Sequence, residues 1–279
     1  MIDDGLAVVT VAFDSDAVLE PFLASLAASR LQPAAVVVSD NAPALGAAAA
    51  IAERWGARVV ENPDNPGYGS AVNRAIASLP ESIDVVLVSN PDVVLDPDAL
   101  DELVAALRSD AAIAAVGPRI VNADGSTYPS ARSVPAIGTG IGHALFHRVW
   151  PANPWTAKYH RLEDTPVERS AGWLSGACVL IRRRAFDSVG GFDESFFMYF
   201  EDVDLGYRLG LAGWENRYRP SARVLHTGAH STTSRASAMS RAHHESAQRF
   251  LRRRYPHRWQ APLRGLTALG LLLRSRMVA

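Results

Sequence analysis

The sequence has one cysteine and no long apolar segment, and each absence excludes a class of protein. Because Cys178 has no second cysteine to pair with, an intramolecular disulfide is excluded, and a reducing compartment is favoured. The best apolar segment, residues 265–273, is about half of the ~20 residues that span a bilayer. The N-terminus is acidic where an export signal is basic. We therefore expect a cytoplasmic protein without a membrane span.

The chain also has almost no net charge. Its 279 residues carry a formal charge of −1, which argues against binding of nucleic acid by the whole molecule. A hydrophobic fraction of 48% with 20% charged side chains is typical of a globular protein with a substantial core. The charges are unevenly spread, because residues 241–279 contain nine arginines and a single acid, Glu245. We expect a globular body followed by a basic C-terminal segment.

Apolar strands alternate with helices through the first half of the chain. The pattern predicts strands over residues 6–13, 36–38, 58–60 and 85–88, and helices over residues 17–29, 45–55 and 71–78. Strands that are apolar throughout are typical of a mostly parallel sheet covered on both faces. Ligands bind such sheets at the carboxyl ends of the strands, where Asp40, Asn65 and Asp92 fall. The sequence thus predicts an α/β fold with one cleft at that edge.

The second half has shorter elements. Asp124-Gly125 predicts a hairpin, residues 134–166 predict loops or short helices, and residues 172–181 predict one apolar strand opened by small residues. A helix is expected over residues 204–211, closed by Gly213.

Three carboxylates follow an aromatic run in the last third of the chain. Glu201, Asp202 and Asp204 come directly after residues 197–200, which read Phe-Met-Tyr-Phe. Carboxylates beside apolar rings are costly to ionise, so they need a metal, cationic partners or a catalytic task. A solvated acidic turn is the alternative, but such a turn rarely follows four large apolar residues. The cluster favours catalysis or substrate binding.

Two other positions suit a divalent cation. Asp92 ends the stretch Asn90-Pro91-Asp92 after a strand, and Pro91 fixes the backbone there. His226 follows another apolar strand, and imidazole is a common ligand for Mn²⁺. One carboxylate suffices for Mg²⁺ or Mn²⁺ when a diphosphate and water complete the shell. The alternatives are a loop cap at Asp92 and a structural role for His226.

A loop with two glycines opens the helix expected at residue 71. It reads Asn65-Pro66-Gly67-Tyr68-Gly69-Ser70, so its backbone amides can face an anion or a nucleotide. It matches neither a Walker loop, since no lysine follows, nor the dinucleotide fingerprint. A plain tight turn is the alternative.

In order along the chain, these residues resemble the inverting family-2 glycosyltransferases. Five stretches carry the resemblance over about residues 6–232: Asp40, Asn65 to Asn73, Asn90 to Asp92, Trp173 to Gly176, and Glu201-Asp202. It implies the GT-A fold, a Rossmann-like nucleotide-binding mixed sheet flanked by helices. The chain departs from the family where Asn90 replaces the first acid of the Asp-x-Asp motif. It departs again at residues 42–45, which read Ala-Pro-Ala-Leu instead of Ser-Thr-Asp-Gly.

The resemblance implies a role for each matching residue. Asp202 resembles the general base, Asp40 resembles the acid that binds the nucleobase, and Asp92 with His226 resembles the Mn²⁺ or Mg²⁺ site. The expected donor contacts are Thr10, Asp40, Asn41, Asn65, Gly67, Tyr68, Gly69, Asn73, Asn90 and Asp92. The expected acceptor contacts are Glu201, Trp173, Ser175 and Gly176. Asp204 is expected to cap the following helix.

Within the family, the chain is more closely similar to actinobacterial rhamnosyltransferases that act on polyprenyl-diphosphate-linked N-acetylglucosamine. Residues 128–132, 153–156, 172–178 and 197–205 carry this similarity. It implies dTDP-rhamnose as donor and the linker disaccharide of cell-wall arabinogalactan, on a lipid carrier, as product. Another donor or acceptor, and a noncatalytic sugar-nucleotide-binding module, stay open as alternatives. A nucleotidyltransferase is disfavoured, since residues 7–16 lack a basic glycine-rich loop.

We expect a catalytic domain over residues 1–235, with a donor half to about residue 118 and an acceptor half from 119. A basic amphipathic helical segment is expected over residues 236–279. Its arginines precede Trp259 and an apolar stretch, a composition that suits the anionic inner face of the cell membrane. The alternative is a helix that packs on the domain or on a second subunit, so a homo-oligomer is a further expectation.

Overall fold

The computed structural model describes residues 1–135, 166–228, 236–262 and 265. Its strands are β1 (Ile2–Ala12), β2 (Gln32–Asp40), β3 (Arg58–Glu61), β4 (Val85–Ser89), β5 (Val93–Leu95), β6 (Ile113–Asn122), β7 (Thr127–Tyr128), β8 (Ala131–Arg132), β9 (Arg169–Ala171), β10 (Trp173–Leu174), β11 (Cys178–Arg182) and β12 (Glu215–His226). Its helices are α1 (Asp16–Ala27), α2 (Ala48–Arg54), α3 (Tyr68–Ala77), α4 (Ala99–Ser109), α7 (Arg183–Ser188), α8 (Glu201–Leu211) and α9 (Ala236–Arg254), followed by the 3₁₀ turn η2 (Arg258–Gln260).

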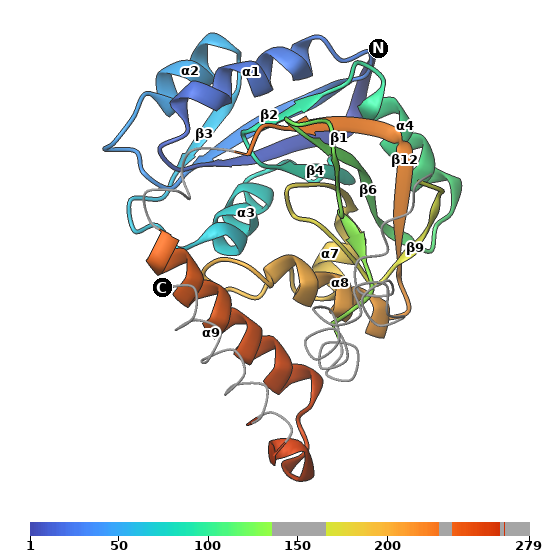
Figure 1. Cartoon of the computed structure of the whole chain (residues 1–279). Helices are drawn as coiled ribbons and strands as arrows, with labels where there is room; N and C mark the ends of the chain where they lie inside the picture. The colour runs from blue at the N-terminus through green and yellow to red at the C-terminus, as the bar shows by residue number, and fades with distance from the viewer. Residues whose placement is uncertain (136–165, 229–235, 263–264, 266–279) are drawn as a thin grey trace.

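A mixed sheet forms the centre of the molecule, as Figure 1 shows. Its main strand order in the described residues is β3-β2-β1-β4-β11-β6-β12-β5, with β7 paired to β6 and β9 to β12. Strands β3, β2, β1 and β4 are parallel, whereas β11 runs antiparallel to β4 and β6. Because of this reversal, Cys178 at the start of β11 lies beside Ser89 at the end of β4. The segment before β11 therefore reaches the edge where the parallel strands end.

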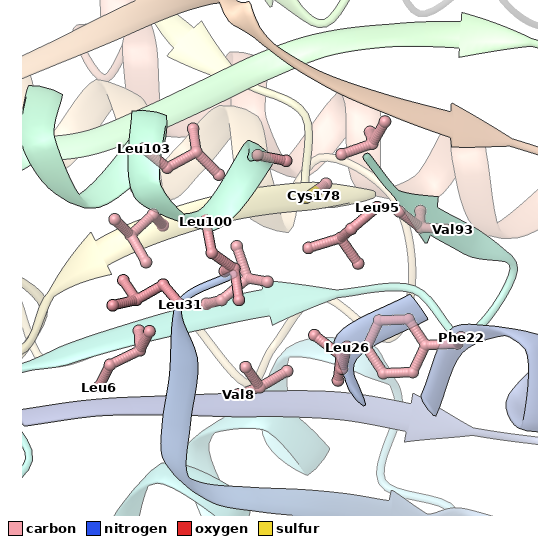
Figure 2. Packing of buried hydrophobic residues seen from close by; sticks show 14 of the residues in the cluster. Leu6, Val8, Phe22, Leu26, Leu31, Val93, Leu95, Leu100, Leu103 and Cys178 are labelled. Atoms are coloured by element: carbon pink, nitrogen blue, oxygen red, sulfur yellow. The ribbon is translucent and has the colours of Figure 1, made fainter. Parts of the chain in front are cut away.

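Helices cover both faces of this sheet, which explains why its strands are apolar throughout. On β1, Leu6 and Val8 pack with α1, α2 and α4, whereas Ala7 and Val9 pack with α3, α7 and α8. Figure 2 shows the first of these layers, with Phe22 of α1 and Leu100 of α4 gathered over the strands. The predicted α/β layer structure is confirmed.

Three elements near the candidate site differ from the sequence prediction. Helix α3 begins at Tyr68, inside the glycine loop, and α8 begins at Glu201, so the acidic cluster is helical. The single strand expected over residues 172–181 is wrong, because Trp173–Leu174 pairs with β8 and Cys178–Arg182 joins the main sheet. The predicted turns are confirmed, since Gly125 and Gly213 have φ of +83° and +85°. Residues 136–165 of the expected loop region lie outside the described residues.

Helix α9 packs on the rest of the molecule. Phe250 is fully buried in a small cluster with Trp173, Phe196 and Val203. The predicted boundary at residue 235 stays a prediction, but the helix that follows it contacts the predicted catalytic domain. No helix in the described part of the chain combines the length and apolar character needed to cross a membrane.

Candidate active site

Several predicted site residues meet at one edge of the sheet. Strand β2 ends at Asp40, and β4 is followed by Asn90, whose N–H donates to the Ala177 carbonyl oxygen at 2.9 Å. Strand β12 ends at His226, beside β5, and α8 begins at Glu201. The strand order thus gathers side chains that are far apart in sequence.

Asp202 lies against the turn that joins β10 to β11. Its Oδ2 accepts a hydrogen bond from the Gly176 N–H at 3.0 Å, and its Oδ1 accepts one from the Val203 N–H at 2.8 Å. Burial raises the pKa of Asp202, while the two N–H donors and the Arg132 cation oppose that rise by stabilising the charged form.

Glu201 is the buried neighbour of Asp202. It is 7% exposed, and its Oε2 has no hydrogen-bond partner among the described residues. Burial, followed by the charge of Asp202, raises the pKa of Glu201 to about 8. The two carboxyl groups titrate as a pair, and the donors around Asp202 favour the negative charge there. Near neutral pH the pKa of about 8 leaves Glu201 mainly protonated, while the N–H donors around Asp202 favour the ionised form of that carboxyl group.

Tyr68 joins helix α3 to this turn. Its hydroxyl donates to the Gly176 carbonyl oxygen at 2.8 Å. Burial and the nearby carboxylates of Glu201 and Asp202 hold the pKa of Tyr68 well above its usual value. The phenol is therefore neutral and positions the Gly176 turn.

Asp92 and His226 are far apart in the sequence, but their side chains lie next to each other in the structure. His226 Nε2 lies 3.1 Å from Asp92 Oδ2, and Asp92 is 6% exposed. The Asp92 carbonyl oxygen accepts hydrogen bonds from Thr227 N–H at 3.0 Å and Thr227 Oγ1 at 3.1 Å, which fix the loop.

This pair fits a divalent cation. A carboxylate oxygen and an imidazole nitrogen side by side are donors that Mn²⁺ accepts. The described residues contain no group of three or more candidate ligands, so phosphate oxygens and water would supply the remaining positions.

Hydrogen bonds fix some of the predicted donor-binding residues in place. Asp40 is buried, its Oδ1 accepts from the Ala42 N–H at 2.9 Å, and burial raises its pKa. The Asn41 amide donates to the Gly67 carbonyl oxygen at 3.3 Å and thereby ties β2 to the glycine loop. Gly67 has φ of +91°, and a Cβ there would lie 2.2 Å from the Phe197 carbonyl oxygen. Only glycine fits between the donor loop and the aromatic segment.

Two further residues predicted to bind the donor, Asn73 and Thr10, differ in their hydrogen bonding. Both ends of the Asn73 side-chain amide are bonded to the Phe192 backbone, at 2.9 and 3.0 Å, so Asn73 holds a loop. The Thr10 hydroxyl is fully buried and has no partner in the part of the chain that the structure describes. Such a hydroxyl is costly unless water or a ligand bonds to it. Direct donor contacts by Thr10, Asn65, Gly69 and the others stay predictions.

The prediction that Asp204 caps a helix is wrong. Because α8 begins at Glu201, Asp204 is already in its first turn and is fully buried. Its carboxylate bonds Arg208 Nε at 2.6 Å and Arg253 Nη1 at 2.5 Å. Asp204 therefore links α8 to α9.

Arg132 is a site residue to which the sequence assigned no role. Its guanidinium lies 5.6 Å from the Tyr128 ring centroid and 5.3 Å from that of Trp173. Trp173 also donates from Nε1 to the Ser133 carbonyl oxygen at 3.1 Å, which fixes the indole. Arg132 thus lies on the Trp173 ring, and its charge acts on Asp202. This arrangement depends on the pairing of β8 with β10, which the sequence does not show.

Comparison with known proteins decides the family. The sequence profile described as "Glycosyltransferase like family 2" matches residues 4–245. The chain belongs to glycosyltransferase family 2. This assignment confirms the family resemblance and the glycosyltransferase class.

Two relatives illustrate the similarity within this family. The chain is 45% identical to the Mycobacterium tuberculosis N-acetylglucosaminyl-diphospho-decaprenol L-rhamnosyltransferase, over 99% of this chain and 93% of that protein. It is 29% identical to the Escherichia coli rhamnosyltransferase WbbL, over 67% of this chain and 71% of that protein.

Solved structures confirm the predicted GT-A fold. A Pyrobaculum calidifontis mannosyltransferase in complex with GDP-mannose and Mn²⁺ matches with a TM-score of 0.60 at 14% identity, over 97% of this chain and 70% of that one. The structure of GalNAc-T7 with UDP, GalNAc and Mn²⁺ matches with a TM-score of 0.57 at 18% identity, over 80% of this chain and 43% of that one. At these identities the likeness concerns the fold alone.

Proposed function

We propose that this protein transfers rhamnose from dTDP-rhamnose to N-acetylglucosaminyl-diphospho-polyprenol, inverting the anomeric carbon. The observation that carries the proposal is the 45% identity, over nearly the whole of both chains, to a mycobacterial enzyme named for that acceptor and sugar. The product would be the lipid-borne linker disaccharide of a cell-wall polysaccharide.

In the proposed reaction, Asp202 accepts the proton of the acceptor hydroxyl while that oxygen attacks the anomeric carbon. The bond from that carbon to the diphosphate breaks in the same displacement, and the nucleoside diphosphate leaves. A single displacement inverts the centre, so one base suffices. The Gly176 and Val203 N–H groups suit Asp202 to this task because they stabilise its ionised form against the burial that raises its pKa.

Glu201 has a different task in this proposal. Its protonated carboxyl lies beside the base, and its Oε2 has no hydrogen-bond partner among the residues that the structure describes, so it can hydrogen-bond an acceptor hydroxyl and orient it toward Asp202. Trp173, Ser175 and Gly176 would line the acceptor side, since Gly176 bonds Asp202 and the other two residues lie just before it, in β10 and the turn that follows.

Asp92 and His226 would hold the divalent cation, which supplies positive charge that stabilises the leaving diphosphate. The adjacent Asp92 and His226 donor atoms support this assignment. Asn90 stays a donor contact in the proposal, because its amide cannot replace the missing carboxylate as a charged ligand.

Contact with the inner face of the cell membrane is part of the proposal, because the acceptor is a lipid. Several basic residues of α9 are engaged elsewhere: Arg253 binds Asp204, while Arg249 and Arg254 lie over the rings of Phe196 and Tyr207. Trp259 is 76% exposed, and Arg258 beside it is also exposed. We assign membrane contact to these two residues. The Trp259→Ser, Arg258→Glu variant should lose flotation with anionic liposomes, whereas unchanged flotation would remove this part of the proposal.

A donor and acceptor panel tests the function. The purified chain is incubated with Mn²⁺ or Mg²⁺, a polyprenyl-diphosphate N-acetylglucosamine acceptor, and dTDP-rhamnose or other sugar nucleotides. We expect a lipid-linked disaccharide with dTDP-rhamnose. Transfer of another sugar would mean that the protein is a family-2 glycosyltransferase with a different donor. Binding of dTDP-rhamnose without turnover would favour a noncatalytic module.

A further inference from the structure

The residues just before the carboxylate pair form a strained turn. Tyr199 and Phe200 both have φ of +66°, in the left-handed region that large side chains rarely adopt. Such residues persist only where the surrounding structure fixes them. The next two residues are Glu201 and Asp202, so the direction of this turn determines where both carboxyl groups lie.

Helix α9 contacts each residue of the turn from Met198 to Phe200. Ser246 Oγ donates to the Met198 carbonyl oxygen at 2.8 Å. The His243 ring lies 5.5 Å from the Tyr199 ring centroid and 5.3 Å from that of Phe200. Phe250 is fully buried, with its ring centroid 5.8 Å from that of Phe200. These contacts hold the strained backbone from one side, along the length of α9 that Figure 1 shows.

The same helix also fixes the first turn of α8, after the carboxylate pair. Arg253 Nη1 bonds the fully buried Asp204 carboxylate at 2.5 Å, and its Nη2 pairs with Asp193. Helix α9 therefore holds the chain both before and after Glu201 and Asp202. The α9 residues that make both sets of contacts lie within residues 243–253, about fifty positions after the residues that they contact.

We propose that α9 is a positioning element of the active site, in which His243, Ser246 and Phe250 hold the left-handed turn that directs Asp202 at the acceptor. The inference rests on the proposed role of Asp202 as base. Without these contacts the turn is free to relax to negative φ, which moves Asp202 away from the Gly176 N–H. The nucleotide-binding residues Asp40 and Asp92 lie on other elements and keep their places.

Point variants of the full chain test this inference. His243→Ala and Ser246→Ala remove two contacts to the turn, while His243→Phe keeps an aromatic ring against Tyr199 and Phe200. Arg252→Ala is the matched control, because Arg252 is exposed on the same helix. The acceptor is supplied in detergent, so that differences in membrane binding do not affect the measured rates. Each variant is assayed for kcat, for dTDP affinity and for the melting temperature.

We expect His243→Ala and Ser246→Ala to lower kcat by about tenfold or more, because a misplacement of ~1 Å can cost about 100-fold. The dTDP affinity should change by less than about threefold, and His243→Phe should recover most of the kcat lost in His243→Ala. Arg252→Ala should stay within about twofold of the wild type in kcat. A lowered melting temperature with kcat unchanged in both alanine variants would show that α9 only stabilises the fold, and would overturn the inference.

A second readout is independent of the substrate assignment. Amide hydrogen exchange of residues 199–204 should be faster in His243→Ala than in Arg252→Ala, since the strained turn loses its support. Unchanged exchange at these residues would also overturn the inference. If the wild type transfers a different sugar, the kinetic comparison is made with that donor, so an error in the proposed substrate is distinguishable from an error about α9.

Discussion

Replacing Glu201 by glutamine tests the charge state of the carboxylate pair. Burial raises the pKa of Glu201 from 4.5 to about 8, so the folded state binds this proton more tightly than the unfolded state does. The contribution of the Glu201 proton to stability is therefore fully present below about pH 4.5 and is lost as the pH rises toward 8. Glutamine resembles the protonated acid in shape and does not ionise, so the Glu201→Gln variant lacks this loss.

The structure gives the size of the effect. At about 1.4 kcal/mol per pH unit, the rise from 4.5 to about 8 corresponds to at most about 5 kcal/mol of unfolding free energy above pH 8. At pH 7 the variant should be more stable than the wild type by about 3 kcal/mol. At pH 4 the unfolding free energies should be similar.

Urea denaturation at pH 4, 7 and 9 measures these free energies. Glu81→Gln is the matched control, since Glu81 is exposed, and it should stay within about 0.5 kcal/mol of the wild type at each pH. The reasoning is refuted if Glu201→Gln is less stable than the wild type at pH 9, or if the difference between them does not depend on pH. Either result would mean that the pKa of Glu201 is not raised in the folded protein.

Three other predictions follow from the same geometry. His226→Ala should raise the Mn²⁺ concentration that gives half of the maximal transfer rate by at least about tenfold, as a titration of Mn²⁺ against rate will show. An unchanged half-saturating concentration would mean that His226 is not a metal ligand. Asp204→Ala should lower the unfolding free energy by about 3 kcal/mol in urea, because two arginines lose a buried partner, whereas Glu20→Ala at an exposed pair should cost no more than about 0.5 kcal/mol. Arg132→Met removes a cation that favours the charged form of Asp202, so the acid limb of the kcat/KM profile should move to higher pH; a shift to lower pH would contradict this assignment.

The sequence predicted those parts of the fold that depend on local pattern. Continuous apolar strands such as residues 85–89 are recognisable because both faces of the sheet are covered. The start of α8 was not predictable, since the left-handed residues Tyr199 and Phe200 are held by α9 and have no local signature. For the same reason the expected strand over residues 172–181 was too long, because β10 is defined by its pairing with β8.

In the candidate site too, the sequence indicated the residue types but not which of them lie together. The residue types at Asp92, His226 and Asp202 suggested their chemistry, but the approach of Asp92 to His226 depends on the pairing of β5 with β12. The arginines of α9 looked alike in sequence. Only their contacts distinguish Arg253, which binds Asp204 and Asp193, from its neighbour Arg252, which is exposed.

The most direct test of the central claim is the transfer activity of Asp202→Asn with dTDP-rhamnose and the lipid-linked N-acetylglucosamine acceptor. The substitution keeps the size of the side chain and removes its ability to accept a proton, and a general base contributes about 100-fold to 10,000-fold. We predict that turnover falls below about a hundredth of the wild-type rate while dTDP affinity is unchanged. Turnover above about a tenth of the wild-type rate would contradict the assignment of Asp202 as the base.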